Sequence, residues 1–261
     1  MLRLFSQIRQ KLLTDNKFSK YLLYAVGEIL LVVIGILIAL QVDTWNQWRQ
    51  ERQMEQVVLR QLRDDFQANL AQLDQKMRMR KAIIGASLSI LQAMDHPDRA
   101  SRDSVISNLA ILLIDPTFDP IENDLSSNGD LRLITNNKLK RLLSNWSSDI
   151  VAVRELEHNW VDVLRQEYLP ALVELGVYRD LAHTFLNDLE MDWALSGTAR
   201  FEDVAVGTAK QPVPLETIAA SARLEGLVAA ALTYNTTANL ESQTLRGRIE
   251  EILALIEAEI R

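Results

Sequence analysis

Few residues of the sequence have the types and the spacing that catalysis or metal binding requires. The chain contains no cysteine and only three histidines, His96, His158 and His183. The lack of cysteine excludes disulfides, Cys-ligated metal centres and a thiol nucleophile. The histidines do not have the spacing of a metal-binding pair, and the sequence has no phosphate-binding glycine loop, nucleophile elbow or zinc-protease motif. We therefore expect no catalytic residue and no cofactor, and a protein that is not an enzyme.

A group of acidic residues lies in one predicted loop. Its members are Asp115, Asp119, Glu122 and Asp124. Carboxylates are ligands that Ca²⁺ prefers, but this spacing does not match an EF-hand. Asp beside Pro, Ser or Asn is common in turns and helix caps. We expect these side chains to serve turns and caps and to hold no metal ion.

Glu28 is the acidic residue whose setting points to a functional site. It is the only charged residue of the run 21–42. An acid within a membrane is costly unless it faces a partner, a cavity or an ion path. Helical spacing places it on one face with small residues, which let helix backbones approach closely in a bilayer. The sequence therefore predicts a transmembrane interface made of Ala25, Glu28, Val32, Gly35 and Ala39. Two alternatives stay open: Glu28 reaches the inner headgroups and Lys20, or it carries a proton or a cation.

The run 21–42 has the length and composition of a transmembrane helix. At about 1.5 Å per residue it spans about 33 Å, and the hydrocarbon core of a bilayer is about 30 Å thick. The stretch 29–40 is apolar on every side, which a core helix of a soluble protein does not need. The run is too long for a cleaved signal peptide, and no small-residue cleavage site follows it. We expect one helix that crosses the lipid bilayer.

The charges on the two sides of this run predict its orientation. Five Lys or Arg and one Asp give residues 1–20 a net charge of +4, whereas residues 43–261 carry −10. Positive flanks stay in the cytoplasm. We therefore expect the N-terminus in the cytoplasm; in a bacterium the helix would cross the inner membrane and residues 43–261 would lie in the periplasm. The aromatic residues expected at the membrane–water interfaces are Tyr21 and Tyr24 on the inner side and Trp45 and Trp48 on the outer side.

The tail before the run has a helical pattern of its own. Leu2, Phe5, Ile8 and Leu12 recur at helical spacing beside basic residues. This favours a basic amphipathic helix on the inner leaflet, with a disordered basic tail as the alternative. The acidic remainder of the chain argues against nucleic-acid binding, which needs a basic face.

Residues 43–261 have the composition of a helical domain. Gly and Pro are scarce, at nine and six in the whole chain, and the alternation typical of strands is rare. Apolar residues recur every three or four positions over three long stretches. The first stretch runs from Asp43 to about Met94. The second runs from about Thr135 to Gly176, with a candidate kink at Pro170. The third runs from about Leu215 to the C-terminus. The predicted fold is all-α: one N-terminal transmembrane helix followed by an elongated antiparallel helical bundle.

Local signals predict where these helices begin and end. Asp95-His96-Pro97 is predicted to end the first long helix. Within that helix, Arg80 or Lys81 interrupts the apolar stripe. Ser101 is the predicted cap of a short helix that follows. Thr135 is the predicted cap of the second long helix. Another short helix is expected near 121–127, and a further one over 178–195. The longest irregular stretch is 196–214, and the polar residues 234–244 interrupt the apolar pattern of the last helix.

The first third of the sequence resembles a known family. The segments NKFSKYLLYAVGEI (16–29) and VVIGILIALQ (32–41), with Trp45-Asn46, resemble the start of an uncharacterised bacterial family of single-pass membrane proteins, a domain of unknown function. A weaker similarity covers LSSNGDLRLI (125–134). The resemblance implies the single-pass topology and a helical architecture, and it brings no activity or catalytic residue.

Three functions are compatible with these features. The first is a structural or interaction protein that forms a homo-oligomer, or docks on another membrane protein, through the Glu28 face and presents a periplasmic bundle. The second is a periplasmic ligand-sensing module that signals through a membrane partner. The third is a proton- or cation-coupled subunit that uses Glu28.

Overall fold

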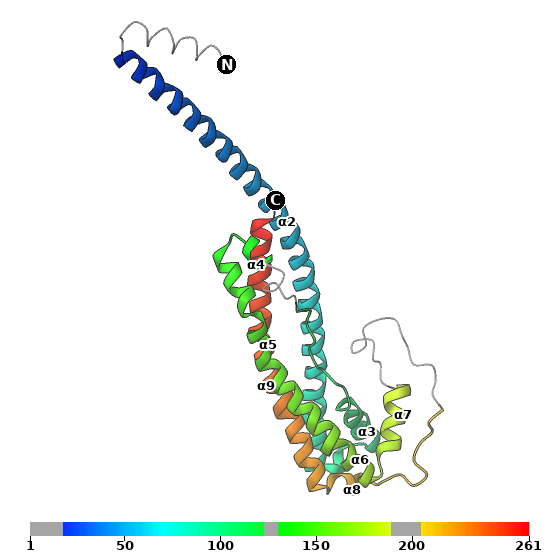
Figure 1. Ribbon diagram of the computed structural model, residues 1–261. Coiled ribbons are helices and arrows are strands. Elements are labelled where there is room, and N and C mark those ends of the chain that lie inside the picture. Colours follow the sequence, from blue (N-terminus) through cyan, green and yellow to red (C-terminus); the bar gives the residue numbers. More distant parts are fainter. Residues whose placement is uncertain (1–17, 123–129, 189–204, 261) are drawn as a thin grey trace. The chain divides into compact units, whose positions relative to one another are not determined.

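The structure is a computed structural model that describes residues 18–122, 130–188 and 205–260, without the side chains of residues 18–21, 23, 24, 130 and 188. Every regular element in these ranges is helical (Figure 1), which confirms the predicted all-α class. The chain divides into two compact units, residues 1–57 and 58–261, which are described one at a time. The predicted amphipathic helix of the tail falls on residues outside the described ranges.

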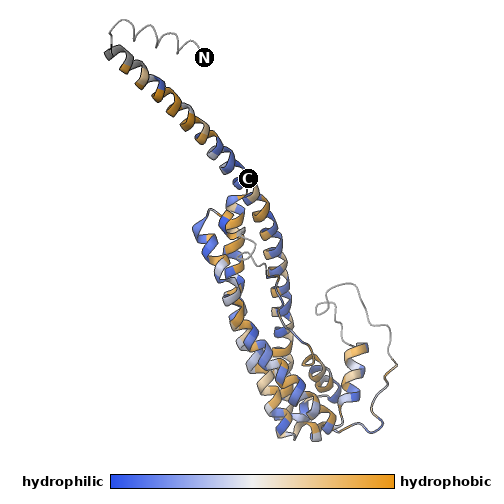
Figure 2. Ribbon diagram, viewed as in Figure 1, coloured by the Kyte–Doolittle hydropathy of each residue, from blue (hydrophilic) through white to orange (hydrophobic). Residues whose placement is uncertain are grey.

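The first unit contains the N-terminal part of α2 (Phe18–Asp95). Among the described helices, α2 is long and apolar enough to cross a membrane: its most apolar window has a mean hydropathy of 2.5, and none of that window is buried. Figure 2 shows this hydrophobic stretch as a nearly unbroken band of orange. Ile29 and Leu31 are 65% and 69% exposed. Among the described residues of the first unit, therefore, none covers these side chains.

The end of α2 follows from one proline. The ring of Pro97 disfavours a helical conformation at the residue before it, and His96 has φ −136° and ψ 64°. A short 3₁₀ turn, η1 (Pro97–Arg99), leads to α3 (Arg102–Ile111). The hydroxyl of Ser101 accepts a hydrogen bond from the backbone N–H of Ser104. Both the predicted end of α2 and the predicted cap of α3 are confirmed.

The next long helix, α5 (Asn137–Val163), follows the short α4 (Asp130–Leu133) and begins one residue later than the predicted cap implies. Asn136, and not Thr135, is the cap, because its side-chain oxygen accepts from the backbone N–H groups of Lys138 (3.0 Å) and Leu139 (3.1 Å). The short helix expected near 121–127 lies mostly outside the described residues, and its described members, 121 and 122, are not helical.

The chain continues from α5 through a π-helical turn, η2 (Leu164–Tyr168), into α6 (Leu169–Leu175). The wider π turn ends two residues before Pro170, which cannot donate a hydrogen bond to the helix. Gly176 ends α6 with φ +80°, a conformation that glycine adopts without strain. Two short elements follow, α7 (Tyr178–His183) and η3 (Thr184–Asp188). The rest of the helix predicted over 178–195 lies outside the described residues.

The last predicted helix is in fact two helices. A short α8 (Leu215–Ala219) is separated from α9 (Ala222–Glu259) by a break at Ser221, whose side chain caps α9 at the N–H of Leu224. The residues 205–214 before α8 are irregular, as the sequence predicts for that stretch.

In the second unit, α9 runs antiparallel to both other long helices. Ion pairs join Asp74 to Arg246 (2.8 Å) and Arg63 to Glu257 (4.0 Å), so residue numbers fall along α2 as they rise along α9. Ion pairs that join α5 and the following η2 to α9 show the same antiparallel order of residue numbers. They are Lys138–Glu251 (2.8 Å) and Glu167–Arg223 (3.1 Å).

By contrast, α5 runs parallel to α2. The rings of Phe66 and Trp146 lie 4.9 Å apart, and further along both helices Arg80 pairs with Glu157. The predicted antiparallel arrangement therefore describes α9 against its two partners, whereas α2 and α5 point the same way. A connection must return the chain along the bundle before α5 can begin.

Residues 114–122, which we call the return strap, make part of that connection. Asn69 of α2 is buried, donates from Nδ2 to the carbonyl of Ile121 (3.1 Å) and accepts from its N–H (2.7 Å). Gln72 accepts from the N–H of Asp119 (3.1 Å). Buried backbone outside regular structure must find hydrogen-bond partners among side chains. Pro116 and Phe118 of the strap are buried, whereas Asp119 and Ile121 are exposed, so the strap lies along the bundle with α2 supplying these partners.

Two hydrophobic cores lie on the three long helices. Core 1 contains the buried apolar residues of α2 between Leu59 and Met77, of α5 between Leu139 and Val153, and of α9 between Leu245 and Ile256, together with Phe118 of the strap. Core 2 contains buried residues of α2 between Met79 and Ala93, Trp160 of α5, Tyr168 of η2, and residues of α9 between Leu224 and Ala231, together with α3. Apolar burial of this kind stabilises each half at roughly 25 cal/mol per Å² removed from water. The residues between the two cores are polar, and they form the most unusual site of the unit.

Candidate functional site

The predicted transmembrane interface lies on α2 in the first unit. Ala25 and Glu28 are partly exposed, and Val32, Gly35 and Ala39 are exposed. Their spacing on an unbroken helix puts all five on one face, as the sequence predicts.

Among the described residues, nothing packs closely against the glycine of this face. A Cβ atom built on Gly35 meets no other atom within 4 Å, and the same is true of Gly27 on the same helix. Neither glycine has the positive φ that a side chain would strain.

The structure describes the side chains of two of the four predicted interfacial aromatic residues. Trp45 and Trp48 are 59% and 57% exposed, and the guanidinium of Arg49 lies 5.9 Å from the Trp45 ring centroid, within range of a cation–π contact. Tyr21 and Tyr24 belong to α2, and their side chains are outside the described part of the chain.

A polar layer separates the two cores of the second unit. At its centre Arg80 is completely buried. Its Nη1 donates to a carboxylate oxygen of Glu157 and to the carbonyl of Pro116 (3.3 Å), and its Nη2 donates to the hydroxyl of Ser242 (2.7 Å). Its Nε donates to the side-chain oxygen of Asn239 (3.4 Å). One guanidinium therefore joins α2 to α5, α9 and the return strap.

Glu157 completes the layer from α5. It is 2% exposed, and its second carboxylate oxygen accepts from the backbone N–H of Phe118 (3.0 Å). The pair thus satisfies one carbonyl and one N–H group of the strap, on either side of Thr117. The polar layer consists of Arg80, Glu157, Asn239 and Ser242.

The charges of this layer carry a burial penalty. Desolvation raises the pKa of Glu157 above its usual value, against the opposing effects of Arg80, the Phe118 N–H and Lys76. Desolvation likewise lowers the pKa of Arg80, although Glu157 acts in the other direction. For both groups, removal from water disfavours the charged form by more than the partner favours it.

The sequence indicates no role for Glu157, and it does not distinguish Arg80 from Lys81 as the residue that interrupts the apolar stripe. The structure turns Arg80 inward and leaves Lys81 exposed. The polar stretch 234–244 of the last helix also belongs to this region, since Asn235, Asn239 and Ser242 within it are all buried. The sequence signal for the layer is one polar interruption of the apolar pattern in each long helix: Arg80, Glu157 and residues 234–244.

The predicted loop acids lie beside cations. Asp119 and Glu122 lie 3.6 and 2.7 Å from Arg154, and Asp115 lies 3.6 Å from Arg165 and accepts from the N–H of Thr117. Asp124 is outside the described residues. Within the described ranges, no group of three or more His, Asp or Glu side chains is arranged to hold a metal ion.

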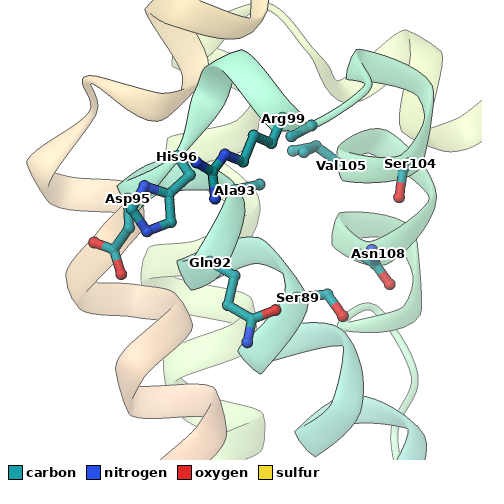
Figure 3. Close-up of a pocket in the computed structure, with 10 residues that line it drawn as sticks. Ser89, Gln92, Ala93, Asp95, His96, Arg99, Ser104, Val105 and Asn108 are labelled. Atoms are coloured by element: carbon teal, nitrogen blue, oxygen red, sulfur yellow. The ribbon is translucent and has the colours of Figure 1, made fainter.

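The three histidines occupy separate places. His158 is exposed, with Nδ1 2.7 Å from the carbonyl of Arg154, and His183 lies near Asn187. His96 lines an open hollow of about 390 Å³ between the end of α2 and α3 (Figure 3).

The hollow has an apolar floor and a polar rim. Ala93 and Val105 at its base are buried. The rim residues are Ser89, Gln92, Asp95, His96, Arg99, Ser104 and Asn108. Figure 3 shows Arg99 reaching back toward the His96 ring. Their hydroxyl, amide and charged groups can bind a small polar molecule by hydrogen bonds.

Comparison with known proteins finds a similarity over part of the chain. Residues 28–94 match a family described as a family of unknown function, DUF6090. No curated protein and no solved structure matches the chain. The matched segment contains Glu28 and Gly35 of the predicted interface and Asn69, Gln72 and Arg80 of the second unit. The expected resemblance to an uncharacterised family is confirmed to that extent.

The raised pKa of Glu157 predicts how stability depends on pH. Between the ordinary pKa of a glutamate and the raised pKa of Glu157, the folded chain binds more protons than the unfolded chain. The contribution of Glu157 to the free energy of unfolding therefore falls as pH rises through that window. Thermal unfolding of the full chain in mild detergent, followed by circular dichroism, should show this slope in the wild type, and Glu157→Gln should remove it. Equal slopes in both proteins would contradict the assignment.

Proposed function

We propose that this chain is a single-pass membrane protein that associates with a second copy of itself through the Ala25–Ala39 face and holds its helical bundle outside the cytoplasm. The observation that carries the proposal is the uncovered apolar segment of α2: an 18-residue window with a mean hydropathy of 2.5, none of it buried. Apolar surface of this size is unfavourable in water, and lipid removes that penalty.

The flanks of the segment support its orientation. The cations of residues 1–20 favour the cytoplasm, and the exposed Trp45 and Trp48 suit the outer membrane–water interface. In a bacterium the bundle then lies in the periplasm and the helix crosses the inner membrane.

Two features of the face favour a second copy as its occupant. Gly35 and Ala39 leave a smooth strip on which an identical strip can pack closely, and within the described residues the space beside Gly35 is open. Glu28 lies on the same face. In a two-fold symmetric pair each Glu28 would approach its own equivalent, where a carboxylic acid can hydrogen-bond across the interface.

Gly35→Leu should weaken this association. The added side chain fills the strip that the partner helix needs, and we expect a shift of the monomer–oligomer equilibrium of about tenfold or more, or ~1.4 kcal/mol. The measurement is the mass of the full chain in mild detergent over a series of protein-to-detergent ratios. Gly27→Leu is the matched control: it makes the same change on the same helix, about 80° away from Gly35 around the axis by the helical repeat.

The outcomes separate the possible occupants. Loss of mass in Gly35→Leu alone supports self-association through this face. Equal masses of wild type and Gly35→Leu would refute it. A wild-type monomer that co-purifies with another membrane protein, and loses it on Gly35→Leu, would identify docking on that protein instead.

Ligand sensing by the bundle is a second candidate function, and the hollow at His96 and Arg99 is the observation that favours it. The rim of the hollow combines one guanidinium, one imidazole and one carboxylate with hydroxyl and amide groups. This composition suits a small polar molecule that carries a carboxylate.

A thermal-shift screen of the full chain against small carboxylic acids and amino acids tests this function. A ligand at about 100 times its Kd should raise the Tm by roughly 5–10 °C, because it binds only the folded chain. Arg99→Ala should abolish the shift, and Arg141→Ala, at an exposed arginine of α5, should leave it intact. Equal shifts in both variants would exclude the hollow as the binding site.

A further inference from the structure

The aliphatic side chains of the two cores constrain only weakly how far each long helix is shifted along its neighbours. Their buried residues are mainly Leu, Ile, Val and Ala at helical spacing on every one of the three helices. A slip of one turn moves a helix by about 5.4 Å and places apolar side chains against apolar side chains again. Such cores favour collapse strongly and a single alignment only weakly.

The polar layer has the opposite property. The guanidinium of Arg80 is a rigid planar group whose N–H bonds point in set directions. Its partners come from three separate segments: Glu157 on α5, Asn239 and Ser242 on α9, and the Pro116 carbonyl on the strap. A slip of one turn by α2 or α9 would move several of these partners out of hydrogen-bond range. Buried groups that lose their partners in this way are costly.

Stability alone does not explain the layer. Burial of both charges is penalised, as the directions of the two pKa shifts indicate. Apolar residues of similar volume are often as stable as a buried ion pair, or more stable. What the ion pair supplies is selectivity, because it is satisfied in one arrangement of the helices.

The layer also supports the strap. The Phe118 N–H binds Glu157 and the Pro116 carbonyl binds Arg80, while the Phe118 ring is buried in core 1. The segment that allows α5 to run parallel to α2 is therefore held by the same two side chains that join the helices.

We propose that the polar layer of Arg80, Glu157, Asn239 and Ser242 is an alignment device: it selects one register of α2, α5 and α9 and seats the return strap in that register. It does so at the expense of stability. Without the layer, the helices form and pack, but they populate more than one register.

Distances between spin labels in the full chain test this proposal. The natural sequence has no cysteine, so introduced cysteines carry the only labels. Leu88→Cys on α2, Val151→Cys on α5 and Leu240→Cys on α9 alter exposed residues and give three pairs. Pulsed electron paramagnetic resonance in mild detergent, with the labelled chain diluted by unlabelled chain, measures distances within one molecule.

Arg80→Met with Glu157→Gln is the decisive variant. It removes both charges and the bonds of Arg80 to α9, while the amide oxygen introduced at position 157 can still accept from the Phe118 N–H. Each pair in the wild type should show one distance. In the double variant the helical circular dichroism signal should persist, and the α2–α9 pair should gain a second population displaced by about one helical turn.

Arg80→Lys tests the geometry of the guanidinium. Lysine keeps the charge and can pair with Glu157, but one ammonium group cannot reach all the partners of Arg80, so a second population is expected here too. Arg78→Lys, the same substitution at an exposed residue two positions earlier, should leave one distance.

Two results would overturn the proposal. One is a single, unchanged distance for every pair in the double variant, since the cores would then align the helices without the layer. The other is loss of the helical signal in the double variant, because the layer would then be needed for folding itself.

Discussion

Arg80 and Glu157 meet in the interior of the second unit, where both side chains are buried and two hydrophobic cores lie on either side of them. The arrangement of the bundle depends on this pair. Because α5 runs parallel to α2, the chain must return along the bundle between them, and the buried backbone groups of that return need hydrogen-bond partners. Asn69 and Gln72 supply them at one end of the strap, and the ion pair supplies them at the other. The same guanidinium reaches α9, so one buried cation relates all the long helices to one another.

Much of the fold could be predicted from local sequence. Pro97 stops α2, Ser101 caps α3 and Gly176 ends α6, and each acts through its own backbone chemistry, which the sequence displays directly. Errors of one residue, such as the cap at Asn136, and the missed break at Ser221 arise because Ser, Thr and Asn compete for the same capping role over a few positions. The long helices themselves could still be predicted from periodicity, because a stripe of apolar residues remains recognisable when the predicted end of a helix is wrong by one or two residues.

The polar layer and the direction of α5 could not be predicted in the same way. A single arginine on an apolar stripe has two ordinary explanations, exposure at the edge of the stripe or burial with partners, and its partners are 77 and 162 residues away in the sequence. The parallel course of α5 depends on the path of the connection, and helical periodicity contains no information on direction. By contrast, the Ala25–Ala39 face could be predicted from spacing alone, because all its members lie on one unbroken helix.

The match of residues 28–94 to a family of unknown function unites two features in one stretch of α2. Its first part contains Glu28 and Gly35, which on our proposal bind a second copy in the membrane. Its second part contains Asn69, Gln72 and Arg80, which hold the strap and the layer. A single helix thus contributes to the proposed association in lipid and to the alignment of the bundle, and the rest of the chain supplies the partners for the second task.

The central claim, that the chain spans a membrane with its tail inside and its bundle outside, can be tested by thiol labelling in intact cells. Ser6→Cys in the tail and Ser147→Cys on the exposed surface of α5 each introduce the only thiol of the chain. A membrane-impermeant maleimide applied to bacterial spheroplasts should label Ser147→Cys at once and Ser6→Cys only after the membrane is permeabilised. Labelling of both thiols before permeabilisation, or of Ser6→Cys alone, would contradict the account.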